Sequence, residues 1–160
     1  MSLNHPNIAQ MYGCFCDQDH LYLVCEYATD HNLFDLVAAS RQHFLPCSHV
    51  VSIVNQLCSA ISCIHQAEVI HRDIKPENIL ITMGGVLKVC DFGWSVCNSQ
   101  QHLRATFCGT PLYLAPEMVA QNNYDQSVDT WAVGILTYEL LAQRNPFNIT
   151  KLNDLTNIVI

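Results

Sequence analysis

The chain has 160 residues and a mass of 18.0 kDa, enough for one domain with a hydrophobic core. Half of its residues are hydrophobic and 13% are charged, which excludes an intrinsically disordered or collagen-like chain. Seven basic and fourteen acidic residues give a net charge of −7, and the basic residues are scattered. This charge argues against direct binding of nucleic acid and favours a basic ligand or substrate.

Nine cysteines and eight histidines raise the question of a metal site. No two cysteines form a C-x-x-C pair, Cys14 and Cys16 are too close for a zinc knuckle, and the histidines show no matching spacing. Residues 1–6 lack a secretory pattern, and no apolar run approaches the ~18 residues of a membrane span. We therefore predict free thiols and an intracellular chain without a membrane partner.

The first predicted element is a β-hairpin. Two apolar, aromatic-rich runs, Ile8–Phe15 and Leu21–Tyr27, flank a polar tetrad at 16–19 that suits a turn. After a polar break at 29–32, the segment Leu33–Ala39 predicts a short helix.

A long helix is predicted next, with Ser48 as its N-cap. Apolar or weakly polar residues recur from there at helical spacing, namely Val51, Val54, Leu57, Cys58, Ile61 and Ile64. Two short strands, Asn78–Ile81 and Val86–Cys90, follow around a glycine-containing turn at 83–85.

The last third of the chain is predicted to be a loop followed by a buried helix. The loop runs from Phe92 to about Leu114 and is punctuated by glycine and serine. The helix, from about Ser127 to Gln143, is apolar on most faces, which is typical of a central helix covered on all sides. It should end before Pro146, because proline cannot continue a helix.

A set of motifs in fixed order carries the chemistry. They are IHRDIKPENIL at 70–80, DFG at 91–93, CGTP at 108–111, APE at 115–117 and DTWAVG at 129–134. Together they resemble the catalytic loop, metal-binding loop, activation segment and central helix of eukaryotic protein kinases. The resemblance covers essentially the whole chain. It implies an α+β, protein-kinase-like fold: a mainly helical C-lobe with a remnant of the N-lobe antiparallel sheet.

Within the kinases, the chain most resembles the Aurora family. The sequence DFGWSV at 91–96 has a tryptophan that Aurora kinases share, and the segments 3–8, 104–110 and 113–118 fit the same pattern. Another serine/threonine kinase with these motifs is the alternative.

The resemblance implies a serine/threonine protein kinase that uses ATP and Mg²⁺. Asp73 would orient the substrate hydroxyl and accept its proton, and Lys75 would contact the transferred phosphate. Asn78 and Asp91 would hold the metal, since amide and carboxylate oxygens suit magnesium. Phosphoryl transfer needs such residues because its catalysis is chiefly positioning and charge neutralisation. Lys75 also favours the serine/threonine class over the tyrosine class.

The resemblance also implies a nucleotide site. Residues 23–28 match the hinge that joins the two kinase lobes, where backbone groups of Glu26 and Ala28 would bind adenine. Cys25 would occupy the gatekeeper position, and Leu80 would lie beneath the adenine ring.

Regulation is implied at Thr106, the expected activation-loop phosphosite. Arg104 lies two residues before it, as in a substrate of a basophilic kinase, and Arg72 would pair with the phosphate. An unmodified loop threonine is the alternative.

Several further residues are implied to support the site. Thr110 would contact the catalytic loop and help to seat substrates, and Glu77 would meet a basic residue of the substrate. The residues expected to act as scaffold are His71, Phe92, Gly93, Glu117, Asp129 and Trp131. Asp129 would brace the backbone of the catalytic loop. Glu117 would need a later arginine, yet no arginine follows Arg144.

Parts of the kinase pattern do not occur in the chain. No G-x-G-x-x-G loop is present, and the only lysines, Lys75, Lys88 and Lys151, follow the hinge. We expect residues 1–160 to form a partial kinase domain, with 1–28 as the remnant of the N-lobe and hinge and 29–160 as an incomplete C-lobe.

Two explanations of this shortness compete. An incomplete version of an active kinase is favoured, because every large-lobe catalytic residue is intact. A naturally truncated, catalytically inactive binding module is the alternative, and weak adenine binding without transfer lies between them. The expected partners are protein substrates and a regulatory protein. The resemblance suggests the cytoplasm or nucleus, with spindle or chromosome association.

Overall fold

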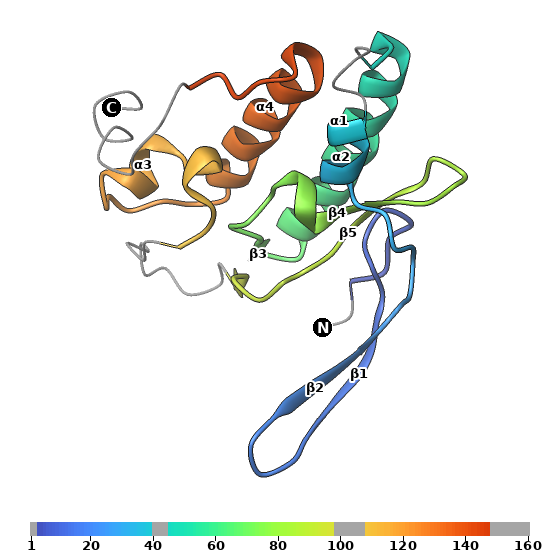
Figure 1. Cartoon of the computed structure of the whole chain (residues 1–160). Coiled ribbons are helices and arrows are strands. Elements are labelled where there is room, and N and C mark those ends of the chain that lie inside the picture. The colour runs from blue at the N-terminus through green and yellow to red at the C-terminus, as the bar shows by residue number, and fades with distance from the viewer. Residues whose placement is uncertain (1–2, 40–44, 98–107, 148–160) are drawn as a thin grey trace.

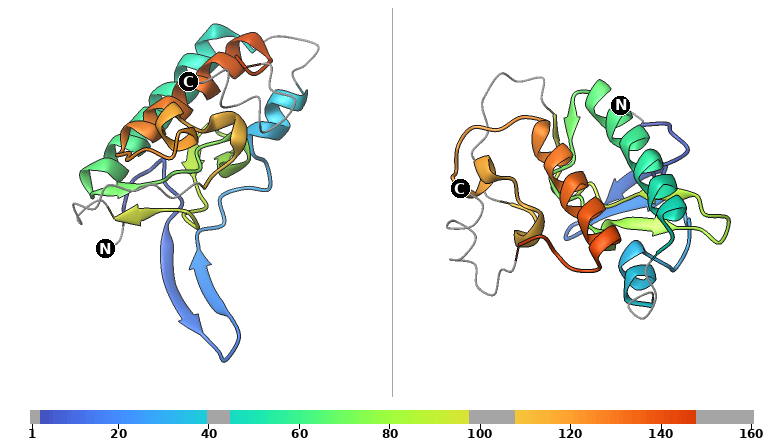
Figure 2. Two further views of the ribbon diagram at one scale, coloured as in Figure 1. Left: turned by 90° about the vertical axis from the view of Figure 1, so that its left-hand side faces the viewer. Right: turned by 90° about the horizontal axis from the view of Figure 1, so that it is seen from above.

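The computed structural model describes residues 3–39, 45–97 and 108–147 (Figure 1). A β-hairpin projects from a mainly helical body, and two long helices lie side by side in that body (Figures 1 and 2). This mixture of helices and small antiparallel sheets is the predicted α+β class.

The hairpin consists of β1 (Met11–Cys16) and β2 (Leu21–Cys25), which pair antiparallel as predicted. Asp17 shapes the turn, because its Oδ1 accepts hydrogen bonds from the backbone amides of Asp19 (2.9 Å) and His20 (2.7 Å). Phe15 and Tyr22 are cross-strand partners, and their rings stack with centroids 4.9 Å apart. Nearly every side chain of the two strands is exposed.

Helix α1 (Leu33–Ala39) occurs where it was predicted. Asn32 precedes the helix, and the Asn32 Oδ1 atom accepts a hydrogen bond from the amide of Asp35 at 2.9 Å. This bond gives a partner to a backbone amide of the first turn that has none within the helix. The buried residues Leu33 and Val37 anchor the helix against the core.

Helix α2 (Cys47–Gln66) is confirmed, but its predicted N-cap is wrong. Pro46 precedes the first turn without a side-chain cap, and Ser48 lies inside the helix. Proline there fixes a backbone angle that suits a helix start and removes an amide that would have no partner. Three predicted core positions, Leu57, Ile61 and Ile64, are buried, whereas Val51 and Cys58 are exposed. The buried face consists of Val50, Ile53, Leu57, Ala60, Ile61 and Ile64.

Two small sheets lie beneath the helices. Strands β4 (Ile79–Ile81) and β5 (Leu87–Val89) form the predicted antiparallel pair, preceded by the short 3-10 turn η1 (Pro76–Asn78). Strand β3 (Val69–Ile70) pairs with β6 (Val96–Cys97), which lies inside the segment predicted as loop. A two-residue strand has too few residues to show an alternating pattern, so the sequence could not indicate it.

The later part of the body contains η2 (Pro111–Tyr113), α3 (Pro116–Val119) and α4 (Ser127–Ala142). Helix α4 stops just short of its predicted last residue, because Gln143 adopts a left-handed conformation with φ of 52°. Its buried residues include Leu136 and Leu140, which belong to the main core with α2 and with β4–β5. A smaller core beneath α3 includes Ile70, Met118 and Val128.

Helix α2 is long and apolar enough to cross a membrane by length and composition alone. In the fold its apolar face packs against α4 and β5, and the core helices of globular domains have the same composition.

Candidate active site

The segment between β3 and β4 carries Asp73, Lys75 and Asn78. The Asp73 side chain is only 4% exposed, and its Oδ2 lies 2.9 Å from Lys75 Nζ. The turn η1 brings Asn78 back toward the same carboxylate, where its Nδ2 donates to the backbone oxygen and to Oδ2 of Asp73, both at 2.9 Å. Three predicted residues therefore meet within one short segment.

Thr110 joins this cluster from 35 residues farther along the chain. Its hydroxyl donates to Asp73 Oδ1 at 3.0 Å and accepts a hydrogen bond from Lys75 Nζ at 2.9 Å. Asp73, Lys75 and Thr110 thus form a closed ring of contacts, which we call the catalytic ring. Such mutual bonding holds each group in one orientation.

The ring sets the charge of Asp73. Burial raises the pKa of this carboxyl, but hydrogen bonds from Lys75, Thr110 and Asn78 outweigh burial and lower the pKa below its usual 3.8. Asp73 is therefore an ionised hydrogen-bond acceptor at neutral pH. This state suits a group that orients a hydroxyl.

Asp129, in the first turn of α4, braces the backbone of the two residues that precede Asp73. It is 1% exposed, and its two oxygens accept hydrogen bonds from the amides of His71 (2.9 Å) and Arg72 (2.8 Å). A third contact joins its Oδ2 to His65 Nε2 at 2.8 Å. Arg72 has a φ of 70°, so the brace holds a strained turn in place.

The DFG residues lie next to this segment. The His71 ring is fully buried, contacts the backbone oxygen of Cys90 through Nε2 at 3.1 Å, and lies 4.8 Å from the Phe92 ring between centroids. Asp91 has a φ of 60°, and its Oδ1 accepts a hydrogen bond from the Gly93 amide at 3.1 Å. The burial of His71 and its contact with Phe92 support the scaffold role predicted for both residues.

A cavity of about 610 Å³ separates the hairpin from β4 and the DFG segment. Most of its surface is apolar, and its polar lining residues include Glu26, Asp91 and Ser95. The residues predicted for the nucleotide and its metal that line it are Cys25, Glu26, Leu80 and Asp91, and the predicted scaffold residues Phe92 and Gly93 line it as well. Ala28 and the catalytic ring are not part of the lining. A cavity of this size and mixed character is typical of a small-molecule site.

Cys90 also lines the cavity and links it to the catalytic segment. Its amide donates to the backbone oxygen of Asn78 at 3.0 Å, and its Sγ contacts the same oxygen at 3.3 Å. Burial raises the pKa of the Cys90 thiol, and the nearby charges of Asp91 and Cys25 raise it further, to about 11. The thiol is therefore protonated and unreactive at neutral pH.

Asn78 and Asp91, the two predicted metal ligands, carry oxygen atoms of the kind that magnesium prefers. The Asn78 amide nitrogen is committed to Asp73, which leaves its oxygen as a ligand, and Asp91 supplies a carboxylate. In the part of the chain that the structure describes, no group of three or more His, Cys, Asp or Glu could hold a metal alone. Magnesium commonly takes only one or two protein ligands and completes its shell with water and substrate phosphates.

Arg72 has two partners that the sequence did not indicate. Its Nε donates to the Trp94 backbone oxygen at 2.6 Å, and one terminal nitrogen donates to the Tyr124 hydroxyl at 2.8 Å. Tyr124 belongs to no motif, so no sequence signal pointed to it. The expected phosphosite Thr106 and its neighbour Arg104 lie outside the described residues.

Glu117 accepts a hydrogen bond from the Ser127 hydroxyl at 3.3 Å. This contact joins α3 to the start of α4. The later arginine that the kinase pattern pairs with this glutamate does not occur in the sequence.

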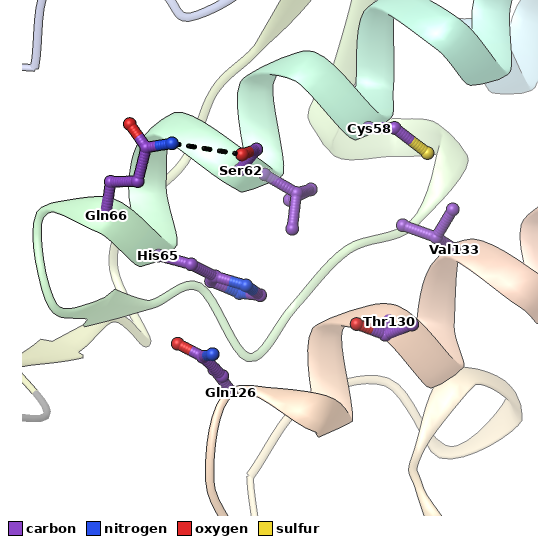
Figure 3. A pocket seen from close by; sticks show the side chains of 8 residues that line it. Cys58, Ser62, His65, Gln66, Gln126, Thr130 and Val133 are labelled. Carbon is purple, nitrogen blue, oxygen red and sulfur yellow. Dashed lines mark hydrogen bonds between the residues drawn. The ribbon is translucent and has the colours of Figure 1, made fainter.

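A second hollow, of about 460 Å³, lies between α2 and α4 (Figure 3). His65, Cys58 and Ser62 line it from α2, and Thr130 and Val133 line it from α4. Through His65 the hollow reaches Asp129 and therefore the backbone brace of the catalytic segment. Sequence patterns could not indicate this hollow, because it depends on how two distant helices pack.

Comparison with known proteins shows the family to which the chain is similar. The sequence pattern of the family described as protein kinase domain matches residues 1–160. An Aurora kinase of Saccharomyces cerevisiae is 43% identical over 148 residues, covering 91% of this chain and 39% of the relative. An Aurora kinase of Encephalitozoon cuniculi is 43% identical over 152 residues, covering 95% and 55%, and Aurora kinase C of Mus musculus is 43% identical over 145 residues, covering 91% and 51%.

These figures confirm the predicted resemblance to Aurora kinases. The chain spans between 39% and 55% of the length of these three relatives. The match to the family pattern extends over every residue from 1 to 160. This chain belongs to the protein kinase family.

Proposed function

We propose that this chain carries the catalytic groups of a serine/threonine kinase that transfers the γ-phosphate of ATP to serine or threonine of protein substrates. The observation that supports this most strongly is the catalytic ring of Asp73, Lys75 and Thr110. An acceptor, a cation and a hydroxyl are held together there beside a cavity with Asp91 at its edge. Protein kinases in general use ATP and Mg²⁺, and the 43% identity to Aurora kinases supports the serine/threonine class.

In this proposal each residue has a role that its contacts support. Asp73 accepts a hydrogen bond from the substrate hydroxyl, orients it and takes up its proton. Lys75 is held 2.9 Å from Asp73 and donates to the phosphoryl oxygens. Thr110 holds both side chains in place through its two hydrogen bonds. The Asn78 oxygen and Asp91 would hold magnesium, which when bound with ATP neutralises charge on the phosphates.

The adenine end of the cavity is assigned to the hinge. In this proposal the backbone groups of Glu26 and Ala28 bind adenine, Leu80 lies beneath it and Cys25 is the gatekeeper. Residues 1–28 are then the small-lobe sheet and hinge, and 29–160 belong to the large lobe. No observation from the structure or from the relatives favours the inactive binding module.

The proposed substrates are proteins with basic residues near the phosphoacceptor. Glu77 is exposed on η1, one residue from Asn78, and the net charge of −7 attracts basic segments. We place the protein inside the cell with a regulatory protein partner. The proposal of a spindle or chromosome location rests only on the similarity to Aurora kinases.

A phosphorylation assay tests the proposal. The chain is incubated with Mg-ATP and either a basic or an acidic serine peptide of equal length. We expect faster labelling of the basic peptide, with transfer reduced at least about 100-fold in Asp73→Asn and in Asp91→Ala. Asp19→Asn, which removes an exposed carboxylate in the hairpin turn, serves as the matched control and should retain activity.

Two results would contradict the proposal. One is labelling that persists in Asp73→Asn. The other is ADP binding, measured by calorimetry, without any phosphate transfer by the unmodified chain; this second result would favour a nucleotide-binding module.

A further inference from the structure

An ion pair at the base of the hairpin has no place in the proposed chemistry. Lys88 Nζ, on β5, lies 2.8 Å from Glu26 Oε1 and 2.9 Å from Glu26 Oε2. The two side chains are 16% and 23% exposed, so the pair is largely shielded from water. Glu26 and Lys88 are 62 residues apart in the sequence. The pair therefore joins two segments that local structure would not bring together.

Glu26 is held by its backbone as well as by its side chain. Its amide donates to the Gln10 backbone oxygen at 2.7 Å, and its Oε2 accepts a hydrogen bond from the Gln10 amide at 3.1 Å. The preceding segment is itself bonded to β5, because the Ala9 amide donates to Val89 oxygen at 2.8 Å. The hinge residue, the segment before β1 and β5 thus form one connected layer.

This layer lies against the cavity. Glu26 is one of the lining residues, and so is Leu80 on β4. Lys88 is the direct cross-strand partner of Leu80, and such partners project from the same face of a sheet. Lys88 therefore neutralises a carboxylate at the edge of the surface proposed to bind adenine.

We propose that Lys88 is a positioning residue that fixes the hinge backbone at Glu26 and thereby raises affinity for adenine nucleotides. The nucleotide part of this inference rests on the proposed function. The hairpin is exposed on nearly all its side chains, so packing restrains it little. Removing Lys88 would leave a partly buried carboxylate without its counter-charge, next to a polyanionic ligand.

Amide exchange of the nucleotide-free chain tests the structural part directly. In Lys88→Met we expect the Glu26 amide, and peptides covering residues 24–28, to exchange about tenfold faster. Exchange in α2 and α4 should be unchanged. Lys88→Arg keeps the charge and should restore protection to within about twofold.

A second variant keeps the inference testable if Lys88→Met fails to fold. Glu26→Gln preserves the shape of the side chain but removes its charge, and should also accelerate exchange at residues 24–28 by several-fold. Asp19→Asn removes a carboxylate from the same hairpin and should not.

Binding of ADP, measured by calorimetry, tests the functional part. We expect about tenfold weaker binding in Lys88→Met and near-normal binding in Lys88→Arg. If the unmodified chain does not bind ADP, the proposed function fails in this chain, whereas the exchange data still decide the role of Lys88. Unchanged hinge exchange, a uniform rise across all helices, or failure of arginine to rescue would each overturn the inference.

Discussion

At the scale of a single residue, Gly109 lets the activation segment pass very close to the catalytic loop. Its φ is 101°, a conformation that residues with side chains rarely adopt, and a Cβ atom there would lie 2.7 Å from the Arg72 backbone oxygen. Arg72 precedes Asp73 directly. Absence of a side chain at Gly109 therefore lets Thr110 reach the catalytic ring.

We predict that Gly109→Ala lowers the free energy of unfolding by about 2–4 kcal/mol, because a strained φ and a steric clash add. Urea denaturation measures this change. Gly134→Ala is the matched control: a Cβ atom added at Gly134, in α4, would have no neighbouring atom within 4 Å, so alanine there should raise stability by about 1 kcal/mol. Equal effects of the two substitutions would contradict the argument.

The sequence indicated the candidate site residues and, through the family resemblance, the contacts of Thr110 and Asp129 with the catalytic loop, but it did not indicate the other partners. Asp73, Asn78 and Asp91 stand in motifs with fixed spacing, so the sequence indicated them directly. Tyr124 and Lys88 stand in no motif, and their contacts with Arg72 and Glu26 arise only when distant segments pack together.

Helix α4 and the catalytic loop are coupled as elements through Asp129. One buried carboxylate accepts two backbone amides from the loop and also contacts His65 on α2. The loop is therefore positioned by the two main helices.

We predict that Asp129→Ala lowers the free energy of unfolding by about 3 kcal/mol, since two backbone amides lose their acceptor in a buried site. Asp125→Ala is the control, because exposed Asp125 only caps the amide of Ser127 at 2.8 Å and its loss should cost about 1 kcal/mol. Thermal or chemical denaturation checks both. A smaller loss in Asp129→Ala than in Asp125→Ala would refute the coupling.

The elements themselves were largely predictable, and their orientation was not. Helical periodicity located α2, a run that is apolar on most faces and ends before a proline located α4, and two short runs around a glycine turn located β4 and β5. The buried face of α2 was predicted correctly at Leu57, Ile61 and Ile64 and wrongly at Val51 and Cys58, because apolar residues cover more than one of its faces. Tertiary packing decides which of these faces is buried.

The stability of the whole molecule should depend on pH through His71. Burial lowers the pKa of this imidazole below its usual 6.5, against the opposing influence of Asp129. The unfolded chain then binds a proton below pH 6.5 that the folded chain does not bind. The folded state therefore keeps its full stability above pH 6.5, where His71 is neutral in both states. Stability is lost as the pH falls from 6.5 toward the folded-state pKa, because protonation then favours the unfolded chain.

We predict that the free energy of unfolding falls by up to about 1.4 kcal/mol per pH unit below about pH 6.5 from this group. Denaturant titrations from about pH 5 to about pH 8, on either side of the usual pKa, measure the slope. His71→Gln should be less stable at neutral pH but should show a shallower slope. An identical slope in the variant would assign the pH dependence to other groups.

The sequence by itself indicated the family, the candidate catalytic residues and most of the elements, because motifs and periodicity are local properties of a chain. The tertiary structure alone decided the partners of Arg72 and the ion pair of Lys88 with Glu26, and it gave the geometry of the contacts that the family resemblance implied for Thr110 and Asp129. The contacts of Arg72 with Tyr124 and of Lys88 with Glu26 join residues that are 52 and 62 positions apart. They depend on how helices and strands pack in three dimensions. Secondary-structure propensity and motif spacing are local properties, so neither predicts that packing.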